Sequence, residues 1–128
     1  MSMDLKYLLF SVLLTFVQVL IAAASANQAV GLNTLAGNRE SMGDLTGFAG
    51  RARRAHLNMI ENMVLFTALV LVAAVAGKAN AMTAMGALIF FWARLIYAVI
   101  YLLGIPWLRT LAWAVSVVGM VMIALQLI

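Results

Sequence analysis

Hydrophobic residues along the chain fall into four long runs, which are separated by shorter polar stretches. The runs extend over residues 5–26, 50–76, 81–103 and 107–128. Each is long enough to cross a hydrocarbon core as an α-helix, which takes about 20 residues. None shows the alternation of polar and apolar residues that is typical of transmembrane β-strands. The pattern therefore predicts an all-α integral membrane protein, a four-transmembrane-helix bundle that forms a single domain over residues 1–128.

The connections between the runs differ in length. Residues 27–49 form one long connection rich in glycine, asparagine and serine, whereas residues 77–80 form a tight turn. This turn makes the second and third segments antiparallel neighbours. In the third connection, Gly104 is typical of a helix end and Pro106 of a helix start.

The distribution of lysine and arginine predicts the orientation in the membrane. The side of the first and third connections carries Arg39, Arg51, Arg53, Arg54 and Arg109. The opposite side carries only Lys6 and Lys78. Because cytoplasmic loops carry an excess of these residues, we expect the first and third connections in the cytoplasm and both termini outside. A bacterial inner membrane is the expected location.

The first run also allows a different interpretation, as a cleaved signal peptide. Residues 24–26 read Ala-Ser-Ala, which resembles a cleavage site. The long apolar core and the presence of Asp4 beside Lys6 fit that pattern poorly. We therefore expect the run to be a membrane span.

Composition restricts the class of protein and its chemistry. Only 9% of the residues are charged, whereas a soluble domain would carry about 25%, so ordinary soluble folding is excluded. The chain has no cysteine, so thiol chemistry would depend on a sulfur that a ligand carries. One histidine and four acidic residues argue against a metal site. We interpret the net charge of +4 as topology signals and anion-binding groups, with no nucleic-acid partner.

Arg94 is the most informative single residue, because it lies deep in the third apolar run. A charge at that depth costs roughly 2.5–3.5 kcal/mol on insertion scales, so it needs a partner. Glu61 is the acidic residue at matching depth, since both lie about 15 Å from the cytoplasmic helix ends. The sequence therefore predicts an ion pair between Glu61 and Arg94.

Further polar side chains share helix faces with these two, because positions three and four apart lie on one face. The second segment carries the stripe Arg51, Arg54, Asn58 and Glu61, and the third carries Arg94, Tyr97 and Tyr101. Asn58 falls level with Tyr97, and Arg54 level with Tyr101. We expect the two stripes to line a polar cleft that opens to the cytoplasm.

Such a cleft suits a small anionic ligand. Arginine forks bind carboxylates, and a carboxylate such as Glu61 can hold an ammonium group. A peptide-like cofactor with two carboxylates and one amine fits this inventory. If it carried a thiol, a nearby arginine or tyrosine could stabilise the thiolate.

Simpler interpretations remain open for the same residues. Glu61 and Arg94 could form a purely structural ion pair that locks two helices together. His56 by itself is more typical of an interfacial residue than of a catalyst. The arginines at positions 51, 53 and 54 could be ordinary topology anchors.

Three stretches resemble one family. The second segment contains RAHLNMIEN (residues 54–62), similar to the RA-x-x-N-x-x-E signature of the MAPEG superfamily, the membrane-associated proteins in eicosanoid and glutathione metabolism. The third segment contains ARLIYAVIY (residues 93–101), which resembles the family's third-helix pattern. The ending GIPWLRTLAW (residues 104–113) resembles the small bacterial branch.

The resemblance implies a homotrimer that binds glutathione as co-substrate between protomers and uses its thiol against a lipophilic substrate from the membrane lipids. By position, Arg54, Asn58 and Glu61 would hold glutathione, and Arg109 would activate the thiol. With their neighbours on the two stripes, the candidate cofactor-binding residues are Arg51, Arg54, His56, Asn58, Glu61, Asn62, Arg94, Tyr97 and Tyr101.

These expectations lead to three functional hypotheses. The first is a membrane-bound glutathione transferase or peroxidase that acts on lipophilic electrophiles. The second is a small proton-coupled multidrug-type transporter with Glu61 as its proton or substrate site. The third is a non-catalytic membrane scaffold or lipid-binding protein.

Overall fold

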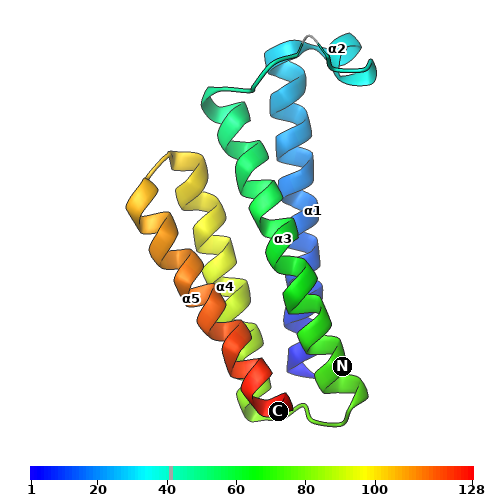
Figure 1. Ribbon diagram of the computed structural model, residues 1–128, viewed down its shortest axis with the longest axis vertical. Helices are drawn as coiled ribbons and strands as arrows, with labels where there is room; N and C mark the ends of the chain where they lie inside the picture. The colour runs from blue at the N-terminus through cyan, green and yellow to red at the C-terminus, as the bar shows by residue number, and fades with distance from the viewer. Residues whose placement is uncertain (41) are drawn as a thin grey trace.

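Four long helices make up most of the structure, a computed structural model that describes residues 1–40 and 42–128. In chain order they are α1 (Met3–Val30), α3 (Gly47–Val75), α4 (Ala81–Leu103) and α5 (Pro106–Leu127), with a short helix α2 (Leu32–Ala36) after α1 (Figure 1). All four long helices are long and apolar enough to cross a membrane. The predicted all-α membrane fold is confirmed, and the chain is a multi-pass membrane protein.

Local sequence explains where α4 and α5 begin and end. The Asn80 side chain accepts hydrogen bonds from the Met82 and Thr83 amides, and the Thr83 hydroxyl accepts one from the Asn80 amide. This reciprocal capping box starts α4. Gly104 ends α4 in the left-handed region, at φ 78°, and Pro106 occupies the first turn of α5. The predicted helix end and start in the third connection are confirmed.

The first connection is more ordered than its composition predicts. Helix α1 continues through the polar residues Asn27 and Gln28 to Val30, past the predicted end of the span at residue 26. Its end is set by Gly31, whose φ of 87° favours glycine and whose amide donates to the Asn27 carbonyl oxygen. The apolar pattern marks only the part inside the membrane, whereas the helix runs beyond it.

Helices α4 and α5 pack as a close hairpin. Gly86 and Gly119 face each other at the crossing, where a Cβ on Gly86 would lie 2.6 Å from the Gly119 carbonyl oxygen. Small residues at this point therefore allow the two backbones to approach. Helix α1 packs against α3 and also against α4, which makes the first span an integral part of the bundle.

The bundle has an apolar half and a polar half. Toward the termini, Phe66 of α3 stacks on Phe90 of α4 with ring centroids 3.8 Å apart. Fully buried Val70, Ala87 and Ile123 belong to the same core cluster. The first and third connections lie together at the other end of the molecule (Figure 1). Toward that end, the contact between α3 and α4 becomes polar.

Candidate functional site

The polar residues of α3 and α4 face each other at the depths that their spacing predicts. Nε of Arg54 donates a hydrogen bond to the Tyr101 hydroxyl oxygen at 3.2 Å. Nη2 of Arg94 donates one to Oδ1 of Asn58 at 2.8 Å. These bonds join residues that are far apart in sequence, so the predicted meeting of the two stripes is confirmed.

The predicted ion pair of Arg94 with Glu61 is not formed within this chain. Arg94 is 0% exposed, but Glu61 is exposed, and no ion pair within 4.0 Å joins them in the described part of the chain. The guanidinium instead stacks on the Tyr97 ring, 4.1 Å from its centroid. Since Tyr97 lies one turn nearer the Gly104 end of α4, this stacking brings the guanidinium to Asn58 and away from Glu61.

Asn58 is held by two donors. Its Oδ1 accepts from Arg94 and, at 3.2 Å, from Nδ2 of Asn62, which also donates to the Asn58 carbonyl oxygen. Arginine can only donate, so the contact identifies the atom as the amide oxygen. The Nδ2 group of Asn58 is therefore not used in these two contacts, and its two hydrogens can be donated to an anion.

Tyr101 is contacted by two cations. Besides the hydrogen bond from Arg54, the guanidinium carbon of Arg109 lies 4.5 Å from the centre of its ring. The Tyr97 and Tyr101 rings are themselves 5.6 Å apart. The two tyrosines therefore connect guanidinium groups from α3, α4 and α5.

A hollow of about 190 Å³ opens beside these groups. It is lined by Asn58, Tyr97, Arg109, Thr110 and Trp113. Thr110 and Trp113 were missed by the sequence analysis, although their spacing of three residues places them on one face of α5. Helix α5 is largely apolar, with Arg109 as its one charged residue and two tryptophans in its first half, so its sequence gave no stronger signal.

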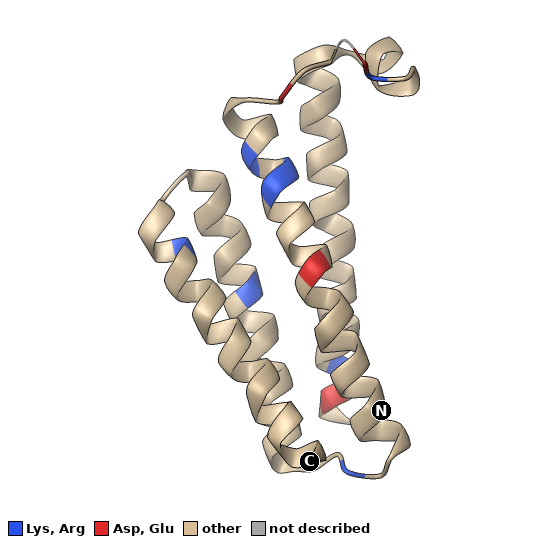
Figure 2. Cartoon of the chain, in the orientation of Figure 1, with Lys and Arg blue, Asp and Glu red and all other residues tan. Residues whose placement is uncertain are grey.

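The surroundings of this hollow are strongly cationic. Arg54, Arg94 and Arg109 come from three different helices, and Figure 2 shows basic segments on each of them. In residues 1–40 and 42–128, no acidic side chain forms an ion pair with any of the three within 4.0 Å. Nε and Nη1 of the buried Arg94 also lack hydrogen-bond partners. Uncompensated charge and unsatisfied donors of this kind favour an anionic ligand.

Other candidate residues lie outside this cluster. Nε of Arg51 donates to the Leu102 carbonyl oxygen at 3.1 Å, so this side chain ties the start of α3 to the end of α4. His56 points to a different side of α3, into a hollow next to α1. Asn62 is buried behind Asn58, and Arg94 reaches the hollow only through Asn58. Their predicted contacts with a cofactor remain predictions.

Comparison with known proteins gives one assignment. No curated protein matches the chain at a significant level. The sequence pattern of the MAPEG family matches residues 7–128, which is nearly the whole chain. This match includes the second-segment motif and both other stretches on which the resemblance depends. The chain belongs to the MAPEG family.

Proposed function

We propose that this protein binds glutathione in the hollow between α3, α4 and α5. One observation carries the proposal, namely that Asn58 and Arg109 line a hollow among three arginines without an acidic partner. Membership of a family named for glutathione and eicosanoid metabolism agrees with such a ligand.

The residues present fit the chemistry of glutathione. The tripeptide has two carboxylates, and each hydrogen bond between a charged pair contributes about 1.5–3 kcal/mol. Arg109 and the Nδ2 group of Asn58 would donate to a carboxylate or to the sulfur. Arg54 is close enough to its Tyr101 partner to supply a second cation beside them. Arg94 is a positioning residue, since it holds the Asn58 amide in the donating orientation.

Glu61 would take part through a neighbouring copy. It is exposed on α3 between the exposed apolar side chains of Ile60 and Val64. A carboxylate facing lipid at this depth is costly, so a second protomer or a ligand ammonium must cover it. We therefore propose a homotrimer in which ligand sites lie between protomers, with Glu61 holding the ammonium group of glutathione.

The proposed activity is that of a glutathione transferase or peroxidase. Bound glutathione supplies a sulfur nucleophile that the cysteine-free chain lacks. Arg109 stabilises negative charge on that sulfur, which raises the thiolate fraction near neutral pH. Thr110 and Trp113 line the hollow and are exposed, so a lipophilic substrate can approach them from the bilayer. The proposed location is a bacterial inner membrane with the hollow open to the cytoplasm.

Titration calorimetry on the purified protein in detergent tests binding, and the ultraviolet absorbance of the thiolate tests activation. We expect saturable binding at millimolar glutathione. Arg109→Ala should abolish the thiolate signal, and Arg54→Ala should weaken binding about tenfold, as expected for one lost charge-assisted contact. Arg53→Ala is the matched control, because this neighbouring arginine is exposed and lines the hollow beside α1. Absence of saturable binding to the folded protein would refute the proposal.

A further inference from the structure

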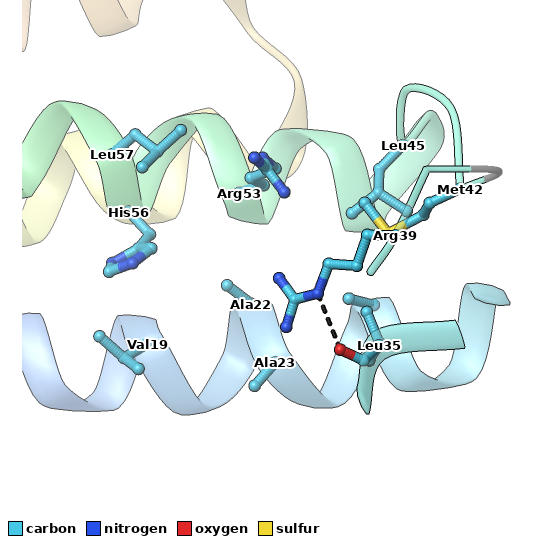
Figure 3. Close-up of a pocket in the computed structure, with 11 residues that line it drawn as sticks. Val19, Ala22, Ala23, Leu35, Arg39, Met42, Leu45, Arg53, His56 and Leu57 are labelled. Atoms are coloured by element: carbon cyan, nitrogen blue, oxygen red, sulfur yellow. Dashed lines mark hydrogen bonds between the residues drawn. The ribbon is translucent and has the colours of Figure 1, made fainter. Parts of the chain in front are cut away.

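A second hollow lies on the other side of α3, between α1, α3 and the first connection (Figure 3). Its volume is about 300 Å³. Most of its lining is apolar, and the apolar side chains that the two helices contribute are Val19, Ala22, Ala23, Ala26 and Leu57. None of the residues around the glutathione hollow lines it. The two hollows are therefore separate within one protomer.

Three basic side chains line this second hollow. They are Arg39, Arg53 and His56. Arg39 extends back from the first connection, and Figure 3 shows its guanidinium between α1 and α3 near Ala22 and Ala23. Its Nε donates to the Leu35 carbonyl oxygen at 2.8 Å, which fixes the side chain in this direction. In the described part of the chain, neither terminal nitrogen of Arg39 has a hydrogen-bond partner, so both can donate to a ligand.

His56 adds an unsatisfied polar atom to the same hollow. Its Nδ1 is buried and has no hydrogen-bond partner among residues 1–40 and 42–128. Figure 3 shows the ring on the α1 side of α3, opposite Val19. Asp44 lines the adjoining hollow together with Arg53, but the two form no ion pair within 4.0 Å in the described chain. Within residues 1–40 and 42–128, none of the three basic groups forms an ion pair with an acidic side chain within 4.0 Å.

Part of the apolar lining lies farther along the helices than the two arginines. Figure 3 shows Arg39 and Arg53 nearer the first connection, and Val19 and Leu57 farther from it. Leu57 is 44% exposed toward the surroundings of the bundle. A ligand with an anionic head and an apolar tail matches this order, because basic groups near a membrane surface attract anionic lipids.

We propose that this hollow binds an anionic phospholipid of the surrounding membrane, with its phosphate between Arg39 and Arg53. Guanidinium forks pair with phosphate oxygens in a bidentate manner, and two forks on opposite walls of one hollow can share a single phosphate. His56 adds a third group at the inner edge of the head-group site. The acyl chains lie against Val19 and Leu57, farther from the first connection. This site goes beyond the proposed glutathione function, since glutathione has no apolar tail.

Native mass spectrometry of the detergent-purified protein tests the proposal. The probes are phosphatidylglycerol and phosphatidylcholine with the same acyl chains, and inorganic phosphate is the tail-free competitor. We expect saturable binding of one phosphatidylglycerol per chain, with phosphatidylcholine at least about tenfold weaker. The double variant Arg39→Ala with Arg53→Ala should lose this preference. Inorganic phosphate should not compete at millimolar concentration.

Control variants keep the test decisive. Lys78→Ala removes a cation at the opposite end of the bundle, and Arg54→Ala removes the neighbouring cation of the other hollow. Both should retain the lipid preference. If the alanine double variant fails to fold, the lysine double variant preserves the charge and should bind with reduced affinity. Equal binding of both lipids, an unchanged preference in the folded double variant, or competition by inorganic phosphate would each overturn the proposal.

The lipid-binding proposal and the glutathione-binding proposal can be refuted independently of each other. Loss of lipid binding in the Arg39 and Arg53 variants should leave glutathione calorimetry unchanged. A protein that binds phosphatidylglycerol but no glutathione would retain this inference and remove the proposed function.

Discussion

The side-chain oxygen of Asn58 accepts hydrogen bonds from both Arg94 and Asn62. The Nδ2 group of the same side chain is therefore the part that can donate to a ligand. Sequence spacing places Asn58 at the right depth, but it does not reveal which partner Arg94 selects. Judged from formal charge and depth in the sequence, Glu61 is the expected partner of Arg94. In the folded chain, stacking on Tyr97 directs the guanidinium to a neutral amide instead.

The substitution Asn58→Asp should change thermal stability and glutathione affinity in different ways. A carboxylate here would pair with Arg94, so we expect thermal stability in detergent to stay equal or to increase. The same change removes the Nδ2 donor and places negative charge on the wall of the hollow. Glutathione affinity should fall more than about tenfold, since an attractive contact becomes a repulsive one. Asn38→Asp, in the exposed first connection, provides the isosteric control and should change neither quantity.

Arg94→Met tests whether the buried guanidinium contributes to stability. Methionine has a similar length, and two of the three guanidinium nitrogens lack partners, so we expect a change in unfolding free energy within about 1 kcal/mol. Glutathione affinity should decrease, because Asn58 loses the contact that orients it. A destabilisation of about 3–5 kcal/mol would instead indicate that Arg94 neutralises a buried acid, such as Glu61 of a neighbouring copy.

At the scale of helices, the crossing of α4 and α5 depends on two glycines. A Cβ on Gly119 would lie 2.6 Å from the Gly86 carbonyl oxygen and 2.9 Å from the Phe90 amide nitrogen. We expect Gly119→Ala to destabilise the protein by about 1–3 kcal/mol, the usual range for overpacking. Thermal unfolding in detergent measures the effect. Val121→Leu, on the exposed side of the same helix, should change stability by less than about 0.5 kcal/mol.

The start of α4 depends on the Asn80 cap. Asn80→Ala removes the acceptor for two amides and should destabilise the protein by about 1 kcal/mol. Asn80→Asp retains the acceptor and should restore most of that stability in the same unfolding assay. Equal destabilisation by both substitutions would indicate that the side chain acts through Gln126, to which its Nδ2 donates at 2.9 Å.

Helix limits could be predicted where capping residues mark them and not elsewhere. The predicted limits of the third span, 81 and 103, agree with α4 because Asn80 and Gly104 flank it. Helix α1 extends beyond its predicted end, and α2 was not predicted at all. Both involve polar residues outside the hydrocarbon region, where apolar periodicity carries no information.

At the scale of the whole molecule, the arrangement of the connections makes the predicted orientation testable. The chain has no cysteine, so single cysteines can be introduced without a background. We expect Asn38→Cys and Ile105→Cys to react with an impermeant maleimide only from the cytoplasmic side. Ala79→Cys should react only from the opposite side. All three positions are exposed, so a reversed pattern would refute the predicted orientation.

The fold class and the antiparallel meeting of α3 with α4 could be predicted because apolar length, a short turn and helical spacing determine them. The residues that line the two hollows could not be predicted from the sequence. Thr110 and Trp113 enter the first hollow because α5 packs beside α3 in the folded chain. His56 was grouped with Arg54 and Asn58 by sequence proximity, but the helical rotation between adjacent residues directs it toward α1.

The stacked pair of Phe66 and Phe90 has a consequence for permeation. It closes the contact between α3 and α4 below Asn58 with aromatic carbon, and no polar side chain continues the stripe of α3 past Asn62 to the far end of the bundle. Along the contact of α3 with α4, the polar groups therefore do not continue to the end of the bundle that holds the termini. Vesicles that contain the protein should remain impermeable to protons and to water-soluble thiols, whichever compartment supplies them.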